Sequence, residues 1–418
     1  MSKLIAGVLL VASLMAYQSY GAETLTVKQA VISAFAVHPS MTVARGGYHQ
    51  ALGQRLVDIS PDPASVSIEY EGISGGKSIN AHREKTLNFS QEFEFPPKYV
   101  WRAKAARITV HEARINALIQ LLDLEQEVRN AYVQTWMIGE KYNILQENTE
   151  AANNYALQIK RMVELGESAP LEQRRAAVEA LQATAQRDAM KNEVAAVWGS
   201  FQGITGIDIT EKKLIPPSTI YKLQNFNFED SYELKEAALQ SKLSNLEKNT
   251  AVFGWLPNLE ATYFIQNVPG EADPDFWGVK FGISVPIWFW LGGRGEVQVS
   301  KAKIRAAEGN IEEIRLRQRI ETDALTQTQA ALSERLVLYE SQIHPLAKEV
   351  HDMATKSYEL GEATYLDVID AQRTLLDIRL EHLEIKAELA NMTSELYRLT
   401  GRSIIGHEEL LKLLDKGN

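Results

Sequence analysis

Four short segments of the chain alternate between apolar and polar residues, and this period of two predicts β-strands. They run over residues 64–73, 86–96, 258–266 and 276–286. In the fourth, one face carries Trp277, Val279, Phe281 and Ile283, and the other carries Gly278, Lys280, Gly282 and Ser284. Each run has about 9–11 residues, the length that a tilted strand needs to cross a bilayer. Alternation alone also fits a half-buried sheet in a soluble sandwich, so both interpretations stay open here.

Two far longer stretches, residues 98–203 and 294–400, carry apolar or small side chains at intervals of three and four. This spacing predicts helical hairpins. At 1.5 Å per residue, a helix from Lys98 to Glu164 would extend about 100 Å. Because the apolar stripe is narrow and most other positions are polar, the helices should pack side by side as in a coiled coil.

The segment ELGESAPLE at residues 164–172 recurs as ELGEATYLD at residues 359–367, which indicates a tandem duplication. The offset of 195 residues continues without a gap, so that Leu181 corresponds to Leu376. Each repeat should contain a short helical lead, two strands and a helical hairpin. The predicted organisation is a first repeat over 23–206, a linker over 207–227, a second repeat over 228–401 and a C-terminal tail over 402–418.

Glycine and proline mark several predicted boundaries. Gly166 and Gly361 lie at matching positions of the two repeats and are predicted to form the hairpin tips. Pro345 should kink the helix that contains it. The helical lead of the first repeat should end at His38 and Pro39, because a residue before proline disfavours the helical conformation.

Four strands cannot close a barrel, and an open strand edge cannot lie in lipid. Membrane barrels begin at about eight strands, so two or more chains would have to combine if these strands span a membrane. Aromatic residues near the strand ends would suit a membrane interface, where a girdle of such side chains is common. The candidates are Trp255, Trp277, Trp288 and Trp290.

The N-terminus has the pattern of a secretory signal, which we predict over residues 1–22. Lys3 supplies a positive charge, and Leu4 to Met15 is an apolar run of about a dozen residues, too short to span a bilayer. A small-residue cleavage site follows near Ala22. An N-terminal membrane anchor is the alternative.

Composition excludes several classes of function. The formal net charge of −10 argues against a nucleic-acid partner, and the absence of cysteine removes disulfides, thiolate metal sites and a cysteine nucleophile. His344 and His351 share a helix face, but about 10 Å separates them along the axis, too far to bind one ion. No catalytic constellation is present, so we predict neither an enzyme nor a bound metal or cofactor.

The whole mature chain, over roughly residues 24–401, resembles the outer membrane efflux protein (TolC) family. The resemblance rests on the duplication, on strands flanked by WLPNL and FPP/VPI segments, and on the tip YELGEATYLDVIDAQRTLL. It implies a mainly α fold with a transmembrane β-barrel portion. Three chains would each give four strands to a twelve-stranded barrel, and the helices would form a periplasmic tunnel. The heavy-metal (cobalt–zinc–cadmium or copper–silver) branch is the part of the family that it resembles most.

The resemblance also implies site residues. LDVIDA matches a family pattern that lines the tunnel entrance, which puts Asp367 and Asp370 in a pore gate. As acidic rings in a trimer they should attract cations and raise one another's pKa. Tyr358 and Glu172 match a closed-state lock, but Ala363 stands where the family has an arginine, so the lock should be weaker or built differently. The tips, at Gly166, Glu167, Gly361 and Glu362, would contact the adaptor.

Together these observations predict an outer membrane exit duct for substrate from an inner-membrane pump and a periplasmic adaptor. The implied partners are a homotrimer, that adaptor, that pump and outer membrane lipid, and the implied substrates are heavy-metal cations. Drug or solvent efflux and type I secretion are alternatives, because a passive tunnel selects its substrate only weakly. A soluble periplasmic adaptor or coiled-coil structural protein is the alternative of another class, and a need for detergent would discriminate against it.

Overall fold

The computed structural model describes residues 24–73, 75, 78–210, 212–217, 228–269, 275–285 and 289–415. The predicted signal over residues 1–22 lies outside the described residues, as does Trp288. The chain folds into two compact units, and each is built from three separate pieces of the sequence. Unit 1 contains Met1–Thr42, Leu121–Phe226 and Ile320–Leu410, and unit 2 contains Val43–Gln120, Asn227–Arg319 and Leu411–Asn418.

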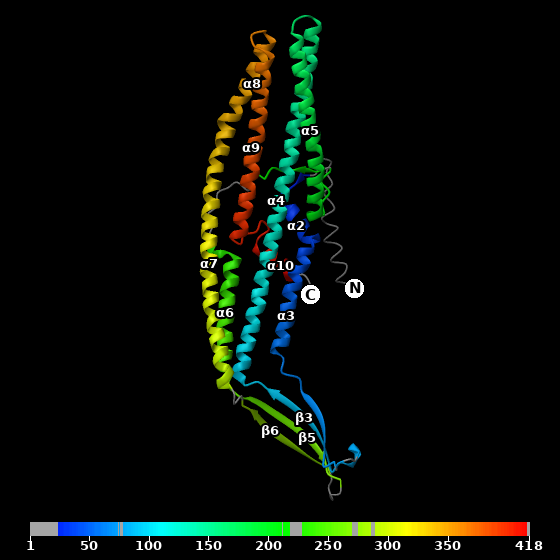
Figure 1. Ribbon diagram of the computed structural model, residues 1–418, viewed down its shortest axis with the longest axis vertical. Helices are drawn as coiled ribbons and strands as arrows, with labels where there is room; N and C mark the ends of the chain where they lie inside the picture. The colour runs from blue at the N-terminus through cyan, green and yellow to red at the C-terminus, as the bar shows by residue number, and fades with distance from the viewer. Residues whose placement is uncertain are drawn as a thin grey trace. The chain divides into compact units, whose positions relative to one another are not determined.

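Unit 2 contains one antiparallel sheet of four strands in the order β2-β3-β5-β6 (Figure 1). The strands are β2 (Ser65–Glu71), β3 (Glu84–Phe93), β5 (Asn258–Asn267) and β6 (Asp275–Ser284). The central pair joins the two repeats, with Phe89 of β3 opposite Tyr263 of β5. Among the described residues, β2 and β6 each pair on one side only, so the sheet of a single chain is open at both edges.

The two faces of this sheet differ in polarity. One face exposes large apolar side chains, including Phe281 at 81% and Trp277 at 69% of their surface. The other face is polar, and there the hydroxyl groups of Ser90 and Thr262 lie 2.8 Å apart across the strands. Phe264 is an apolar exception on the polar side, and its ring lies directly over Gly278. The alternation in the sequence therefore becomes a continuous apolar surface that no part of the described chain covers.

Long helices make up most of the rest of the chain (Figure 1). The first repeat has α4 (Pro96–Glu164) and α5 (Pro170–Thr205), and the second has α7 (Phe289–Leu338), α8 (His344–Glu359) and α9 (Tyr365–Leu399). None of the helices described has an apolar stretch long enough to cross a membrane.

Pro345 lies where the second long helix is interrupted. A π turn over Tyr339–Ile343 separates α7 from α8, and the amide of His344 donates to the carbonyl of Tyr339, five residues earlier. Pro345 then occupies the first turn of α8, where its missing N–H leaves no helical hydrogen bond unmade. A π turn thus directly precedes the proline at which the sequence predicts a kink.

The shorter elements depart from the sequence prediction in three places. The lead α2 (Val27–Val37) ends at His38 as predicted, but a second helix, α3 (Pro39–Ile59), begins at the next residue because proline is favourable at a first helical position. The predicted linker contains β4 (Lys213–Leu214), which pairs in parallel with β1 (Thr24–Leu25). The tail contains α10 (His407–Asp415), and α6 (Tyr232–Val252) is the lead of the second repeat.

A buried ion pair in unit 1 holds the segment that follows α9. Glu125 and Arg129 on α4 are each only 2% exposed, and their charged atoms lie 3.6 Å apart. Glu125 accepts hydrogen bonds from the Ser403 hydroxyl and from the Ile404 amide, the latter at 2.8 Å. The Arg129 guanidinium lies 4.5 Å from the centre of the Tyr397 ring. Burial raises the pKa of Glu125 and lowers that of Arg129, so each charge depends on these partners.

Candidate functional site at the hairpin tips

The two hairpin tips, both in unit 1, close with the same backbone turn. Gly166 and Gly361 have φ angles of 80° and 75°, which non-glycine residues rarely adopt. In the first tip the Glu167 amide donates to the carbonyl of Met162 at 2.8 Å, and in the second the Glu362 amide donates to Ser357 at 2.8 Å. This is the Schellman arrangement that ends many helices, formed here twice by corresponding residues.

The first turn of α9 contains Asp367, whose carboxylate caps the helix. Asp367 Oδ2 accepts from the Thr364 amide at 2.8 Å and from the Thr364 hydroxyl at 2.7 Å, while the Asp367 amide donates back to that hydroxyl. These hydrogen bonds from Thr364 lower the pKa of Asp367, which keeps the carboxylate charged. Asp370 is exposed one turn further along. The structure therefore gives Asp367 a capping role that the sequence analysis did not recognise.

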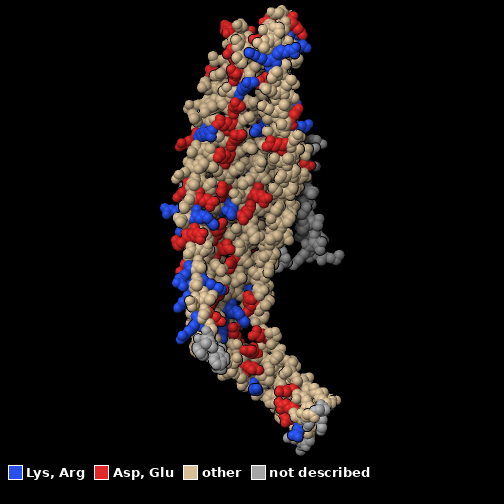
Figure 2. All heavy atoms as spheres, viewed as in Figure 1, with Lys and Arg blue, Asp and Glu red and all other residues tan. Residues whose placement is uncertain are grey.

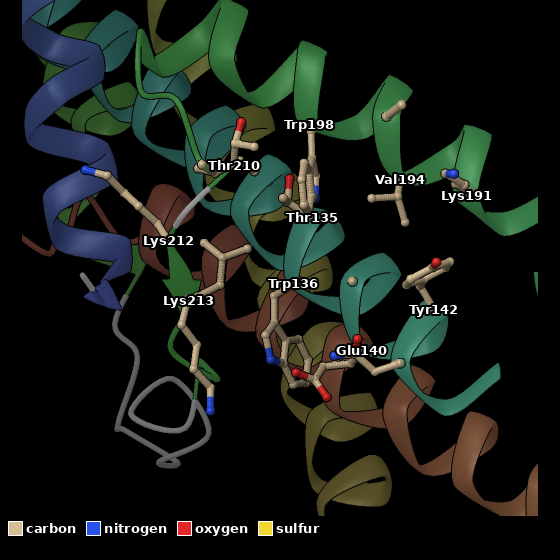
Figure 3. Close-up of a pocket in the computed structure, with 15 residues that line it drawn as sticks. Thr135, Trp136, Glu140, Tyr142, Lys191, Val194, Trp198, Thr210, Lys212 and Lys213 are labelled. Atoms are coloured by element: carbon tan, nitrogen blue, oxygen red, sulfur yellow. The ribbon is translucent and has the colours of Figure 1, made fainter. Parts of the chain in front are cut away.

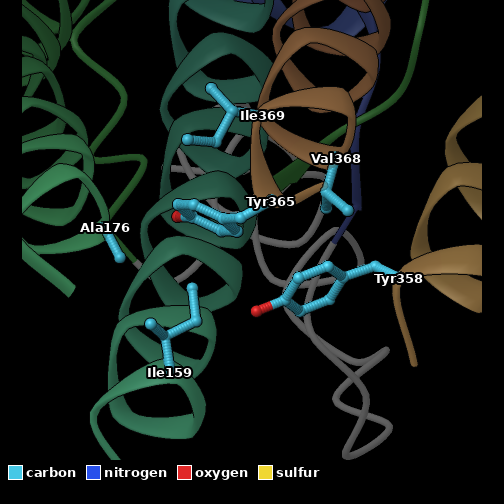
Figure 4. Close-up of a cluster of buried hydrophobic side chains, with 6 residues drawn as sticks. All are labelled: Ile159, Ala176, Tyr358, Tyr365, Val368 and Ile369. Atoms are coloured by element: carbon cyan, nitrogen blue, oxygen red, sulfur yellow. The ribbon is translucent and has the colours of Figure 1, made fainter. Parts of the chain in front are cut away.

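Tyr358 lies where the second tip packs against the first. Only 7% of it is exposed, and its ring centre is 6.0 Å from that of Tyr365 in a cluster with Ile159, Val368 and Ile369 (Figure 4). Burial raises the pKa of Tyr358, the nearby charge of Glu172 adds to this, and a hydrogen bond with Ser168 opposes it.

The predicted lock residues Tyr358 and Glu172 therefore lie near each other, and Ser168 forms a hydrogen bond with each of them. The Ser168 hydroxyl donates to Glu172 at 2.5 Å. Ala363, at the position where the family has an arginine, is half-buried and carries no polar group. The structure shows how these groups are arranged in one chain, and their role in a closed state stays a prediction.

Further polar bonds join the two hairpins away from the tip itself. Arg373 on α9 binds Glu179 on α5, with Nε 3.2 Å from Oε1. Gln372 donates to Asn148 at 2.9 Å, and Arg379 binds Glu147 at 2.7 Å. Sequence reasoning missed these contacts. Which side chains pair across separate helices depends on how the helices pack, and this register cannot be read from the sequence.

No group of three or more acidic, histidine or cysteine side chains among the described residues is arranged to hold a metal ion. His344 lies beside His382 rather than His351, with ring centres 6.1 Å apart. His382 Nε2 is 3.3 Å from Glu340, which also binds Lys386 at 2.8 Å. Burial lowers the pKa of His382, and the charge of Lys386 lowers it further.

The remaining predicted residues lie on the surface wherever the structure describes their side chains. Trp255 is 52% exposed and Trp277 is 69% exposed, as residues at a membrane interface need to be. Trp290 lies in the first turn of α7, and its side chain is outside the described part. Gly166, Glu167, Gly361 and Glu362 are all exposed at the tips and so open to a partner.

A separate cavity of about 710 Å³ lies in unit 1 between α4, α5 and the segment that leads into β4 (Figure 3). Its lining includes three aromatic side chains, Trp136, Tyr142 and Trp198, and the lysine side chains of Lys191 and Lys213. Sequence reasoning did not find this cavity, since its walls come from three separate segments.

Three comparisons relate the chain to known proteins. Residues 229–402 match the family model described as outer membrane efflux protein. The cobalt-zinc-cadmium resistance protein CzcC of Cupriavidus metallidurans is 22% identical over 344 residues, which cover 77% of this chain and 78% of CzcC.

Solved structures show the same fold. The outer membrane protein VceC of Vibrio cholerae has a TM-score of 0.75 and 17% identity, covering 90% of this chain and 96% of VceC. CusC, studied for transmembrane channel formation, has a TM-score of 0.77 and 17% identity, covering 93% of this chain and 96% of CusC. The mainly helical fold of the chain is that of these proteins, and the family model that it matches describes efflux proteins rather than enzymes. The match to the outer membrane efflux protein family model covers residues 229–402, which span the second repeat, and over these residues the chain is similar to that family.

Proposed function

We propose that the chain is the outer membrane exit duct of a tripartite efflux system, with its helices forming a tunnel in the periplasm. The open sheet carries this proposal, because it exposes a continuous apolar face on strands of up to 10 residues. Soluble monomers rarely leave such a surface in water, whereas a strand that crosses a bilayer needs it. The match of residues 229–402 to the outer membrane efflux protein family model supports the same conclusion.

The duct is a homotrimer. The two unpaired edges of the sheet, β2 and β6, would be exposed to lipid in a single chain, at a cost of several kcal/mol for each unmade hydrogen bond. Pairing β6 of one copy with β2 of the next removes every edge when the ring closes. Three copies of four strands give a twelve-stranded barrel, within the range of membrane barrels. Trp255 and Trp277 would then lie in contact with lipid or its interface.

Asp367 and Asp370 form the gate. In a trimer each would appear three times around the axis, and rings of carboxylates attract cations and repel anions. The hydrogen bonds from Thr364 hold the pKa of Asp367 down and so oppose the rise that crowding of like charges would cause. Tyr358 and Glu172, joined through Ser168, would hold the two hairpins of one chain together in the closed state.

The cargo consists of heavy-metal cations, with drugs, solvents or secreted proteins as the alternative. The sequence similarity to a cobalt-zinc-cadmium resistance protein supports metal export, and an acidic entrance suits cations. The tips, at Gly166, Glu167, Gly361 and Glu362, contact a periplasmic adaptor, and an inner-membrane pump supplies the substrate. Selection of the cargo would then belong to the pump, because the duct offers only a charged passage.

Single-channel recording in a planar bilayer tests the gate. Detergent-purified protein should give small cation-selective currents, and the double variant Asp367→Asn, Asp370→Asn should lose selectivity or conduct more. Asparagine keeps an oxygen that can accept from Thr364, so the helix cap is largely preserved. Asp377→Asn is the matched control, because Asp377 is exposed on the same helix seven residues beyond Asp370.

The outcomes separate the duct from the gate. Channels whose selectivity changes equally in the Asp377 control would place the constriction elsewhere and reject the gate. No channel activity, in protein that stays in solution without detergent, would reject the duct and favour a soluble periplasmic adaptor.

A further inference from the structure

The cavity of about 710 Å³ in unit 1 contains open space beside a glycine of α4 (Figure 3). Gly139 lies inside this 69-residue helix, where glycine is less favourable than alanine and usually has a packing or functional reason. No atom of a neighbouring element lies within 4 Å of the position that a side-chain carbon on Gly139 would take. Ala195 of α5 lines the same space. The glycine therefore leaves room that no part of the described chain fills.

Three aromatic side chains line this space. Trp136 and Tyr142 come from α4, and Trp198 comes from α5. Trp136 is 5% exposed, whereas Tyr142 and Trp198 are half-buried. Aromatic rings pack well against another flat ring system, and a cavity of this volume is large enough to enclose a small organic molecule. The lining therefore suits a ligand with a flat apolar body.

A buried polar group in the wall lacks a partner. The indole N–H of Trp136 has no hydrogen-bond acceptor among the described residues. A buried donor without an acceptor is costly, and a buried tryptophan normally finds one. In Figure 3 the indole nitrogen lies on the edge of the ring that is nearer to Lys213. An oxygen atom of a ligand at this edge would supply the missing acceptor.

Lysine side chains determine the charge around the cavity. Lys191, Lys212 and Lys213 line it, although the whole chain has a net charge of −10. In the described lining they face one carboxylate, that of Glu140. Lys191 and Lys213 are exposed, and neither forms an ion pair with another described residue. The cavity therefore combines aromatic walls with an excess of positive charge at its rim.

We propose that this cavity binds an organic anion, a carboxylate or sulfonate with a flat aromatic body. The body lies between the aromatic side chains and beside Gly139. The acid group lies at the Lys213 end, where it accepts a hydrogen bond from the Trp136 indole. The site belongs to the first repeat and the segment that follows it, and it needs neither a trimer nor a membrane. It therefore stands or falls independently of the proposed duct.

Isothermal titration calorimetry tests the site with 2-naphthoate as the probe. The full chain is purified in a non-ionic detergent, and a titration into detergent alone is subtracted. The neutral 2-naphthamide has the same ring system and serves as the control ligand. We expect 2-naphthoate to bind about fivefold more tightly, because hydrogen bonds to charged groups are stronger. No binding of 2-naphthoate, or equal affinity for the two probes, would overturn a site for anions.

The variant Gly139→Leu separates the site from the stability of the fold. Leucine is a better helix former than glycine, and its side chain would occupy the open space. The melting temperature should therefore be kept or should rise, whereas binding of 2-naphthoate should be lost. Retained binding in this variant would place the probe elsewhere, such as on the apolar face of the sheet, and would overturn the proposal.

Charge variants at the rim give a second readout with opposite signs. Lys213→Gln should weaken binding of 2-naphthoate about threefold, and Lys191→Gln should weaken it less. Glu140→Gln should strengthen binding, because it removes a charge that repels the anion. Lys160→Gln is the matched control, an exposed lysine of α4 outside the cavity, and it should change nothing. Equal weakening in Lys160→Gln and Lys213→Gln would show that the charge of the whole chain, rather than this site, attracts the probe.

Discussion

The two hairpin tips have the same backbone turn but use their polar groups differently. Glu172 of the first tip and Asp367 of the second are corresponding residues of the two repeats. Glu172 takes a hydrogen bond from Ser168 and lies near Tyr358, whereas Asp367 takes its bonds from Thr364 and caps α9. Ser168 corresponds to Ala363, and Ala169 corresponds to Thr364. The hydroxyl residue therefore lies one position later in the second tip than in the first.

This comparison shows which features of the turn both tips need and which features can differ between the two tips. The glycine and its backbone bonds are needed in both tips, because they end one helix and begin the return. The acidic group is free to serve either the contact between hairpins or the start of its own helix. In the first tip the acidic residue Glu172 thus lies near Tyr358, whereas the second tip presents Asp367 and Asp370 at the surface.

The largest effect is expected at the side chain where the tips meet. Tyr358→Ala would remove a nearly buried ring from its cluster and should lower the free energy of unfolding by about 3 kcal/mol. Thermal unfolding followed by circular dichroism would measure it. Tyr358→Phe keeps the ring and should cost far less, and equal losses in both variants would show that the hydroxyl, rather than packing, holds the tips.

The next effect should be the same in both tips. Gly166→Ala and Gly361→Ala each force a side chain into the left-handed region, at a cost of about 1–2 kcal/mol. No atom lies within 4 Å of the added carbon in either case, so only the backbone conformation is affected. Melting temperatures of the two single variants should therefore fall by similar amounts, and a loss confined to one of them would contradict the equivalence of the turns.

A smaller and unequal effect is expected from the hydroxyl groups. Thr364→Ala removes the cap of α9 and should cost about 1 kcal/mol, because the amides at the start of a helix lose their acceptor. Ser168→Ala leaves α5 unaffected, since that helix starts at Ala169 and Pro170 without a side-chain cap. Denaturant titration of both variants would rank them, and an equal or larger loss for Ser168 would reverse the assignment of roles.

The smallest expected effect is a loss of stability at the start of α9 at low pH. The pKa of Asp367 is below its usual value of about 3.9, so the capping contribution is complete above that pH and is lost as the pH falls through the lowered pKa. Hydrogen exchange at the start of α9 should therefore rise below about pH 4. Thr364→Ala should return the pKa of Asp367 toward the usual value, and a carboxyl NMR titration that shows no such rise would contradict this origin.

The sequence was sufficient wherever a repeating pattern specified the structure. Alternation located the four strands, and apolar spacing located the hairpins, because both periods are direct consequences of backbone geometry. The Thr364 and Asp367 spacing is also a readable capping signal, whereas the family resemblance assigned the aspartate only to a pore. The Glu125–Arg129 pair, the Arg373–Glu179 bond and α10 could not be predicted, because they depend on which helix faces meet.

The central pairing of the sheet has a consequence for how the protein reaches its folded state. Phe89 and Tyr263, which face each other in β3 and β5, are separated by the whole of the first helical hairpin. Contacts between such distant residues form slowly, and a lone two-stranded β-hairpin is barely stable in water. The sheet is therefore expected to assemble late, after both repeats have been synthesised. Until then the exposed apolar strand faces are the described segments most prone to aggregate.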